Sequence, residues 1–216
     1  MAVVLTKEEE FGQAITIYQV ALQQLMPKLS WQEFPTDDGD SEVILHVVQV
    51  GDSETCNAQD TTACSLYNRA FLIDATNGAT EKTEAFFGLA ATVIYNTALI
   101  YHVASLPISS ISQHERYAKA LRLYEMAISI LGGRASQDSN MNTYLLKLAL
   151  LNNIAQIHAT YFNQNETQAW IETLKRCLQE SLPAASVGDA TLRHDLLHFF
   201  MNVVFVLSQH AHAPVA

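Results

Sequence analysis

Apolar residues recur at steps of three and four along most of the chain, which is the spacing of an amphipathic α-helix. The stripe is unbroken between residues 117 and 131. Gly132 and Gly133 follow it, and glycine tolerates the left-handed conformation that ends many helices. We predict a mostly α-helical fold, with helices over residues 6–26, 82–105, 112–132, 144–162, 166–182 and 190–209.

Two short segments in the N-terminal half have a different pattern. Residues 43–50 and 66–74 are dense in β-branched and aromatic residues, and a polar stretch separates them. Runs of this composition favour strands, and Asn77-Gly78 after the second run is a typical turn pair. We predict a β-hairpin that packs on the helices. The alternative is a buried stretch of helix, because periodicity alone does not separate the two in a short apolar run.

These elements divide the chain into three parts. We predict an N-terminal arm of one helix and the β-hairpin over residues 1–80, a helical repeat region over residues 81–210, and a frayed tail over residues 211–216. A chain of 216 residues is short enough for these parts to form one compact domain.

The helical region contains an internal repeat. The segment from Asn96 to Tyr101 (NTALIY) aligns with that from Asn153 to His158 (NIAQIH), and more weakly with the segment that begins at Asn202. The helices that follow the first two segments also align, and the longer connection around Pro107 explains their different offset. Small residues let two helix backbones approach closely. We therefore expect four alanines to be buried between paired helices: Ala98, Ala120, Ala127 and Ala155.

At residues 101, 120–121, 124 and 127–128 (Tyr, Ala-Leu, Tyr and Ala-Ile) the chain resembles the tetratricopeptide repeat (TPR) family of helical hairpins. The resemblance covers roughly residues 83–209. It departs from the family in Trp170, where a small residue is usual, and in a period longer than about 34 residues. The resemblance implies a stack of hairpins that binds a protein partner on its concave face.

In peptide-binding TPR proteins, an asparagine on the inner helix hydrogen-bonds the backbone of the ligand. Asn96, Asn153 and Asn202 match that position. Members that grip a C-terminal carboxylate also carry Lys or Arg one turn earlier, where this chain has Thr92 and Ala149. We predict that the partner contacts these residues: Asn96, Tyr101, His102, Asn153, His158 and Asn202.

Each of these residues also has a structural interpretation. The asparagines can instead cap or bridge helices inside the stack, because a buried amide must be hydrogen-bonded. His102 and His158 can likewise be histidines buried at a helix interface, and if they line the groove they would make binding sensitive to pH.

Composition limits the class of partner. The chain has twelve Lys and Arg against twenty-two Asp and Glu, for a net charge of −10. This balance argues against binding nucleic acid or an acidic membrane surface, and no apolar run is long enough for membrane insertion. We expect a neutral to basic protein or peptide as partner. Without a signal-peptide pattern, we expect an intracellular, cytoplasmic chain.

The content of 49% apolar and 16% charged residues suggests that some apolar residues are exposed on the surface and covered by another molecule. That molecule is either a partner protein or a second copy of the chain, and a second copy would make a homo-oligomer. The alternative is that the helical layers have a thick apolar core. The three cysteines are expected as free thiols, and the alternative is a Cys56–Cys64 disulfide in an oxidising compartment.

A metal site has the least support of the functions considered. His194 and His198 lie one helical turn apart, the spacing of two imidazoles on one ion. A further ligand would come from His210, from His212 or from elsewhere in the fold. Two histidines one turn apart, without further ligands, are usually surface or interface residues that bind no metal. No phosphate loop or nucleophile elbow is present. We therefore predict a non-catalytic adaptor without a cofactor. The alternatives are a self-associating structural protein and a His-based metal-dependent hydrolase.

Overall fold

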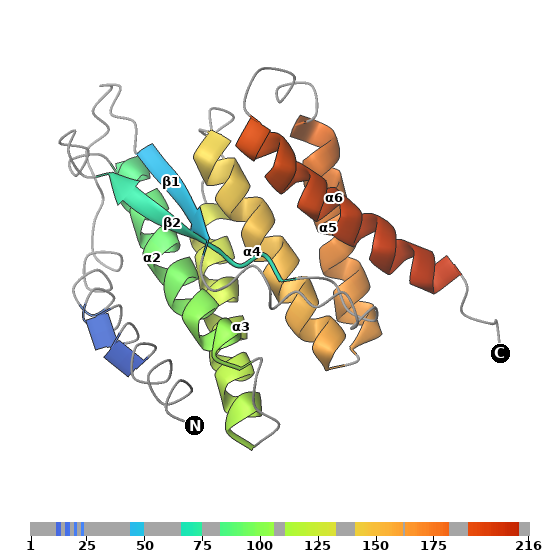
Figure 1. The fold of residues 1–216 in the computed structure, drawn as a ribbon, viewed down its shortest axis with the longest axis horizontal. Coiled ribbons are helices and arrows are strands. Elements are labelled where there is room, and N and C mark those ends of the chain that lie inside the picture. Colours follow the sequence, from blue (N-terminus) through green and yellow to red (C-terminus); the bar gives the residue numbers. More distant parts are fainter. Residues whose placement is uncertain are drawn as a thin grey trace. The chain divides into compact units, whose positions relative to one another are not determined.

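The computed structural model describes residues 12–13, 16–17, 20, 23, 44–49, 66–74, 83–105, 111–132, 141–161, 163–181 and 190–211. Over these residues the protein is mostly helical, which confirms the predicted class (Figure 1). The elements are β1 (Ile44–Gln49), β2 (Arg69–Asp74), α2 (Thr83–Val103), α3 (Ile111–Gly132), α4 (Met141–Thr160), α5 (Gln164–Ser181) and α6 (Ala190–Ala211).

The chain forms two compact units. The first comprises Met1–Val50 and Asn68–Leu146, and the second comprises Gly51–Tyr67 and Lys147–Ala216. Both strands therefore share a unit with α2 and α3, while α5 and α6 belong to the second unit. α4 begins in the first unit, and the larger part of the helix belongs to the second.

β1 and β2 form an antiparallel pair in the first unit, at the positions predicted for the two strands. Val47 lies opposite Phe71 in their register. The two faces of β2 differ, since Phe71 is fully buried and the next residue, Leu72, is 50% exposed. This alternation is the period of two expected for a strand with one buried face.

α2 and α3 pack together as a helical hairpin in the first unit. Ala98 on α2 and Ala120 and Ala127 on α3 are fully buried, as predicted, and so is Ala155 in the second unit. Arg116 joins the two helices, because its guanidinium donates to the carbonyl of Ala104 at 2.8 Å. The small side chains allow close approach of the helices, and this bond closes one end of the hairpin.

The helix ends follow local sequence signals with small differences from the predicted bounds. α3 ends at Gly132, as predicted, but it begins at Ile111, one residue before the predicted start, so Ser112 lies inside its first turn. α5 begins at Gln164, earlier than predicted. Asn163 precedes it and caps it, because Asn163 Oδ1 accepts the N–H of Glu166 at 3.4 Å.

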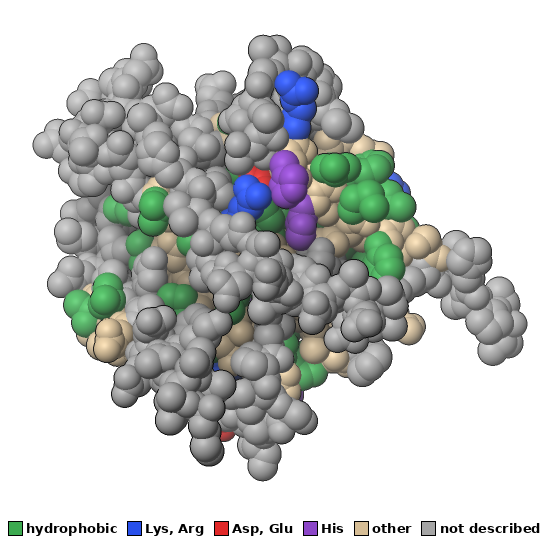
Figure 2. Space-filling view, in the orientation of Figure 1, with side chains coloured by type: hydrophobic (Ala, Val, Ile, Leu, Met, Phe, Trp, Pro, Cys, Tyr) green, Lys and Arg blue, Asp and Glu red, His purple; other side chains and the backbone are tan. Residues whose placement is uncertain are grey.

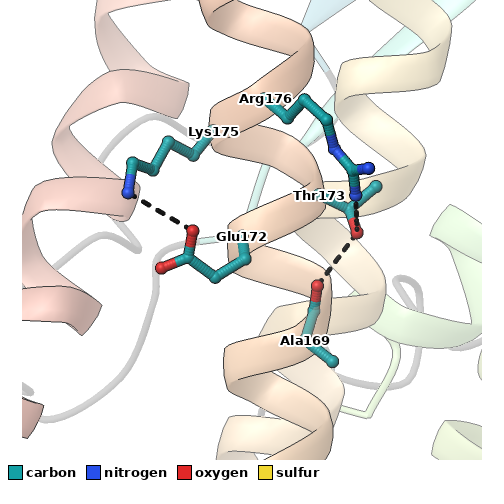
Figure 3. Close-up of polar contacts among 5 residues, drawn as sticks. All are labelled: Ala169, Glu172, Thr173, Lys175 and Arg176. Carbon is teal, nitrogen blue, oxygen red and sulfur yellow. Dashed lines mark hydrogen bonds and ion pairs between the residues drawn. The ribbon is translucent and has the colours of Figure 1, made fainter.

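The second unit buries α4 deeply and leaves one face of α5 in water. Residues 148–157 of α4 are all buried, as expected for a helix that is apolar all round. α5 packs against α6 and presents short-range polar contacts on its surface (Figure 3). Lys175 pairs with Glu172 at 3.3 Å, an exposed ion pair of a kind that contributes ~0–1 kcal/mol.

Cys177 on α5 is a buried free thiol, as predicted for this cysteine. Burial raises its pKa, and the nearby Glu180 also raises it, while the positive charges of Lys147 and Arg176 lower it. The net effect keeps the thiol protonated and unreactive at neutral pH. Cys56 and Cys64 lie outside the described residues.

α6 has two different faces. Phe199, Val203 and Val206 are buried and form its inner face. The helical spacing of apolar residues in the sequence predicts that both Phe199 and Phe200 face inward, but Phe200 is 52% exposed. The reason is the helical rotation of about 100° per residue, which cannot point both Phe199 and Phe200 into one narrow interface.

The predicted helix over residues 6–26 is described at six positions, which are helical and exposed: Gly12, Gln13, Thr16, Ile17, Val20 and Gln23. The spacing of apolar residues predicts a stripe on this helix at residues 11, 15, 18, 22 and 25, and these positions lie outside the described residues. Within the described part of the chain, no helix combines the length and the apolar character needed to cross a bilayer.

Candidate functional site

An asparagine carboxamide on α2 holds the backbone of β2 in the first unit. Asn96 Oδ1 accepts the N–H of Phe71 at 3.0 Å, and Asn96 Nδ2 donates to the carbonyl of the same residue at 2.7 Å. A carboxamide has an acceptor and a donor side by side, so it matches the N–H and C=O that one extended residue presents along a strand edge. Both bonds are buried, and a buried hydrogen bond is electrostatically stronger than one in water.

The bonds to Asn96 lie on the edge of β2 that faces away from β1. Val47 lies opposite Phe71, but Phe71 has a single N–H and donates it to Asn96. The carbonyl of Arg69, two residues earlier on the same edge, accepts the hydroxyl of Tyr95 at 3.0 Å. An uncovered strand edge leaves such groups without protein partners. Here side chains of α2 take the place of a third strand.

The side chain of Phe71 is the second part of this contact. Its ring is fully buried and meets the ring of Tyr95 nearly edge-on, with centroids 5.2 Å apart. Tyr95 also contacts the ring of Tyr124 on α3, at 5.7 Å. An aromatic pair of this geometry contributes ~0.5–1.5 kcal/mol beyond its buried area. β2 is thus held by its backbone through Asn96 and by one aromatic side chain through Tyr95.

The second unit contains the same arrangement around Asn153 of α4. Asn153 Oδ1 accepts the N–H of Tyr67 at 2.9 Å, and Asn153 Nδ2 donates to the carbonyl of Tyr67 at 3.1 Å. The ring of Tyr67 is buried against two rings of α6, those of Phe199 at 4.8 Å and His198 at 5.6 Å. Tyr67 is therefore held through its backbone N–H and C=O and through its own buried ring, as Phe71 is in the first unit.

A chain of buried amides extends from Asn153 to α6. Asn152 Nδ2 donates to Asn153 Oδ1 at 3.2 Å, and Asn202 Nδ2 donates to Asn152 Oδ1 at 2.6 Å. Asn202 Nδ2 also lies 3.3 Å from His198 Nε2. Asn202 therefore bridges α4 and α6, which was the structural alternative for this residue. The bridge orients the carboxamides, because each has a defined donor and acceptor.

Asn96 and Asn153 make the same pair of bonds, and the repeat alignment made these two positions equivalent. We call each set of two bonds an asparagine clamp, and residues 66–74 the clamped segment. In the structure the extended backbone that each clamp holds is the chain's own, at Phe71 and at Tyr67. That the two asparagines bond the backbone of a separate ligand stays a prediction.

The other predicted binding residues lie at helix interfaces or beside them. His102 is fully buried in the first unit, with Nδ1 3.3 Å from the hydroxyl of Tyr124 and its ring edge-on to Tyr117. Tyr101 is half-buried, and the Lys119 ammonium lies 5.7 Å from its ring centroid. In the second unit His158 is half-buried, and its backbone carbonyl accepts the N–H of Asn163.

His194 and His198 have different surroundings despite their helical spacing. The His194 side chain is 69% exposed, and its Nδ1 lies 3.9 Å from the carboxylate of Asp195. His198 Nε2 faces the amide of Asn202. Among the residues that the structure describes, no three His, Cys, Asp or Glu side chains are grouped as metal ligands. The side chains of His210 and His212, the expected further ligands, lie outside the described residues.

Comparison of the chain with protein-family models, with curated proteins and with solved structures finds no match. The asparagine clamps and the surface of α6 are therefore the observations from which a function is inferred.

Sequence reasoning missed the residues that the clamps hold and the amide that links Asn153 to Asn202. Asn152 had a usable signal, because two successive amides inside an otherwise apolar helix must find buried hydrogen-bond partners. Tyr67 and Phe71 were expected only as strand residues. Neighbouring residues in the sequence do not show which helix Tyr67 or Phe71 contacts, because Phe71 lies 25 residues from Asn96 and Tyr67 lies 86 residues from Asn153.

Proposed function

We propose that this chain is a non-catalytic protein-interaction adaptor of TPR-like helical hairpins that binds a partner peptide in extended conformation. The pair of asparagine clamps carries the proposal. Each clamp bonds the N–H and the C=O of one residue. Recognition through main-chain groups accepts any extended chain, and side-chain pockets beside the bonds then provide specificity.

The resemblance to TPR proteins supports the same interpretation, because Asn96 and Asn153 match the asparagines that bond peptide ligands in that family. Thr92 and Ala149, one turn earlier, are uncharged and fully buried, so gripping of a terminal carboxylate is not part of the proposal. The net charge of −10 favours a neutral to basic peptide, since complementary charge speeds association and disfavours acidic partners.

The test is selection of peptides from a random dodecapeptide library on the wild-type protein, followed by affinity measurement on variants. We expect selected peptides to bind Asn96→Ala or Asn153→Ala at least about tenfold more weakly than wild type, because a lost hydrogen bond to a buried group typically removes about 1.4 kcal/mol or more. Fluorescence anisotropy of labelled peptides measures this difference.

Asn163→Ala is the matched control. It removes the same carboxamide from the cap of α5 and weakens the fold without touching a clamp. A second readout uses wild-type protein only: the carboxamide NH₂ resonances of Asn96 and Asn153 should shift when peptide is added. Equal affinity of the clamp variants and wild type, with unshifted resonances, would show that peptides do not bind at the clamps.

A second candidate function, self-association, is favoured by the outer face of α6. Leu197, Phe200, Met201 and Val204 are between 46% and 56% exposed, and their spacing puts them on one stripe of the helix. Figure 2 shows hydrophobic side chains gathered along α6. An exposed apolar stripe of this kind is typical of an interface.

We propose a second copy of α6 as the occupant of this stripe. An antiparallel pair related by a two-fold axis covers each stripe with the other. It also brings the exposed Arg193 of one copy close to the C-terminal end of the partner's α6, where the helix dipole favours a cation.

Light scattering at increasing protein concentration tests the α6 pair. We expect wild type to form a dimer and Phe200→Glu/Val204→Glu to stay monomeric, because a charge buried in an apolar interface is strongly unfavourable. Met126→Glu on α3 is the control, since Met126 is also an exposed apolar residue, at 39%. A wild-type chain that remains a monomer at high concentration would exclude this function.

A further inference from the structure

We propose that the clamped segment, residues 66–74, is an internal competitor that occupies each asparagine clamp, and that an external extended peptide with an aromatic residue at the clamped position displaces it. The inference deepens the proposed function and rests on it. It identifies both the kind of partner and the regulation of binding: the site is closed by the protein's own chain until a suitable peptide takes its place.

The bonds of each clamp do not depend on the covalent attachment of the segment. Asn96 bonds the N–H and the C=O of Phe71, and Asn153 bonds the same two groups of Tyr67, so each clamp holds its segment through backbone groups. Every residue of an extended peptide except proline has these groups. A separate chain can therefore satisfy either clamp as fully as the clamped segment does.

The side chains of the clamped segment define the ligand. The two clamped residues, Tyr67 and Phe71, are both aromatic, and both are almost completely buried. Each has aromatic neighbours: Tyr95 for Phe71, and Phe199 and His198 for Tyr67. Leu72, next to a clamped residue, is half exposed. The favoured ligand of either clamp therefore has an aromatic residue at the clamped position, and at the Asn96 clamp the position after it is tolerant of change.

β2 is held weakly enough for an external peptide to replace it. Among the residues that the structure describes, β1 and β2 form a two-stranded sheet, and a sheet of this size is marginally stable without packing against other elements. Its attachment to α2 comes from the contacts that a competing peptide would replace. A tethered segment has an effective concentration of the order of millimolar, so we expect external peptides to bind the wild-type chain weakly. A change that weakens the tethered segment but leaves both clamp asparagines in place should raise their apparent affinity.

The test uses a labelled synthetic peptide that copies residues 65–76, which contains both clamped aromatic residues and has no net charge. We expect it to bind Phe71→Ala at least about tenfold more tightly than wild type, because the variant keeps both asparagines but lacks the ring that holds its own segment. Leu72→Ala is the matched control and should bind like wild type. A peptide with serine at both aromatic positions should bind neither protein.

A second measurement covers the case in which Phe71→Ala does not fold. In wild type, the amides of Tyr67 and Phe71 should exchange slowly with deuterium, and saturating peptide should make both exchange at least about tenfold faster. Unchanged protection of these amides in the presence of bound peptide would overturn internal competition. In that case, library peptides that shift the carboxamide resonances of Asn96 and Asn153 would still support the proposed function. If no peptide shifts these resonances, both internal competition and the proposed function are wrong.

Discussion

Asn96→Asp is expected to destabilise the protein strongly at pH 7 and only weakly near pH 4. At neutral pH the introduced carboxylate is buried, loses the donor to the carbonyl of Phe71 and puts a negative charge beside that oxygen. An unsatisfied buried group of this kind costs about 1–3 kcal/mol, and more when charge is involved, so we expect a loss of ~3–5 kcal/mol. Urea denaturation at several pH values measures the free energy of unfolding.

The pH dependence follows from the protonated form of the introduced group. A carboxylic acid has one O–H donor and one carbonyl acceptor, so it can make both bonds of the wild-type clamp. Burial raises the pKa of the introduced carboxyl group in the folded state. The folded chain then binds the proton more tightly than the unfolded chain does, and stability is present at low pH and is lost as the pH rises through the raised pKa.

Asn165→Asp is the control for the clamp variant, because Asn165 is exposed at the start of α5. It introduces the same charge, and we expect its effect to stay within about 0.5 kcal/mol at every pH, as is usual for surface substitutions. The clamp would contribute little to stability if Asn96→Asp lost the same small amount at pH 4 and pH 7.

Ala127→Leu is expected to lower the free energy of unfolding by ~3 kcal/mol. Ala127 is fully buried on the inner side of α3, where a larger side chain must push α2 and α3 apart or adopt a strained rotamer. Overpacking of this kind typically costs about 1–3 kcal/mol, and more where the backbone cannot move. The introduced side chain should also disturb the contact between Tyr95 and Tyr124, whose rings lie 5.7 Å apart.

Thermal and urea denaturation measure this effect, with Ala169→Leu as the matched control. Ala169 is exposed on α5, and leucine has nearly the same helix propensity as alanine. The control should therefore stay within about 0.5 kcal/mol of wild type. A similar small change for Ala127→Leu would mean that the small side chain is not required for close packing of the hairpin.

The sequence by itself determined the local conformation of the chain. Helical periodicity located α2 to α6, the density of β-branched residues located β1 and β2, and the burial of Ala98 and Ala127 followed from the need for small side chains between helices. These features depend on backbone preferences and on which face of one element is apolar, and neighbouring residues encode both. The two asparagines were singled out in the same way, from an alignment of one part of the chain with another.

Only the tertiary structure decided what these residues contact. Asn96 and Asn153 hold the clamped segment, Asn202 bridges α4 and α6, and Phe200 lies on the outer face of its helix. Local patterns could not predict these contacts, because any apolar or extended segment satisfies the same pattern. Packing of the whole fold selects which distant segment reaches a given side chain, and for Tyr67 and Asn153 that selection acts across 86 residues.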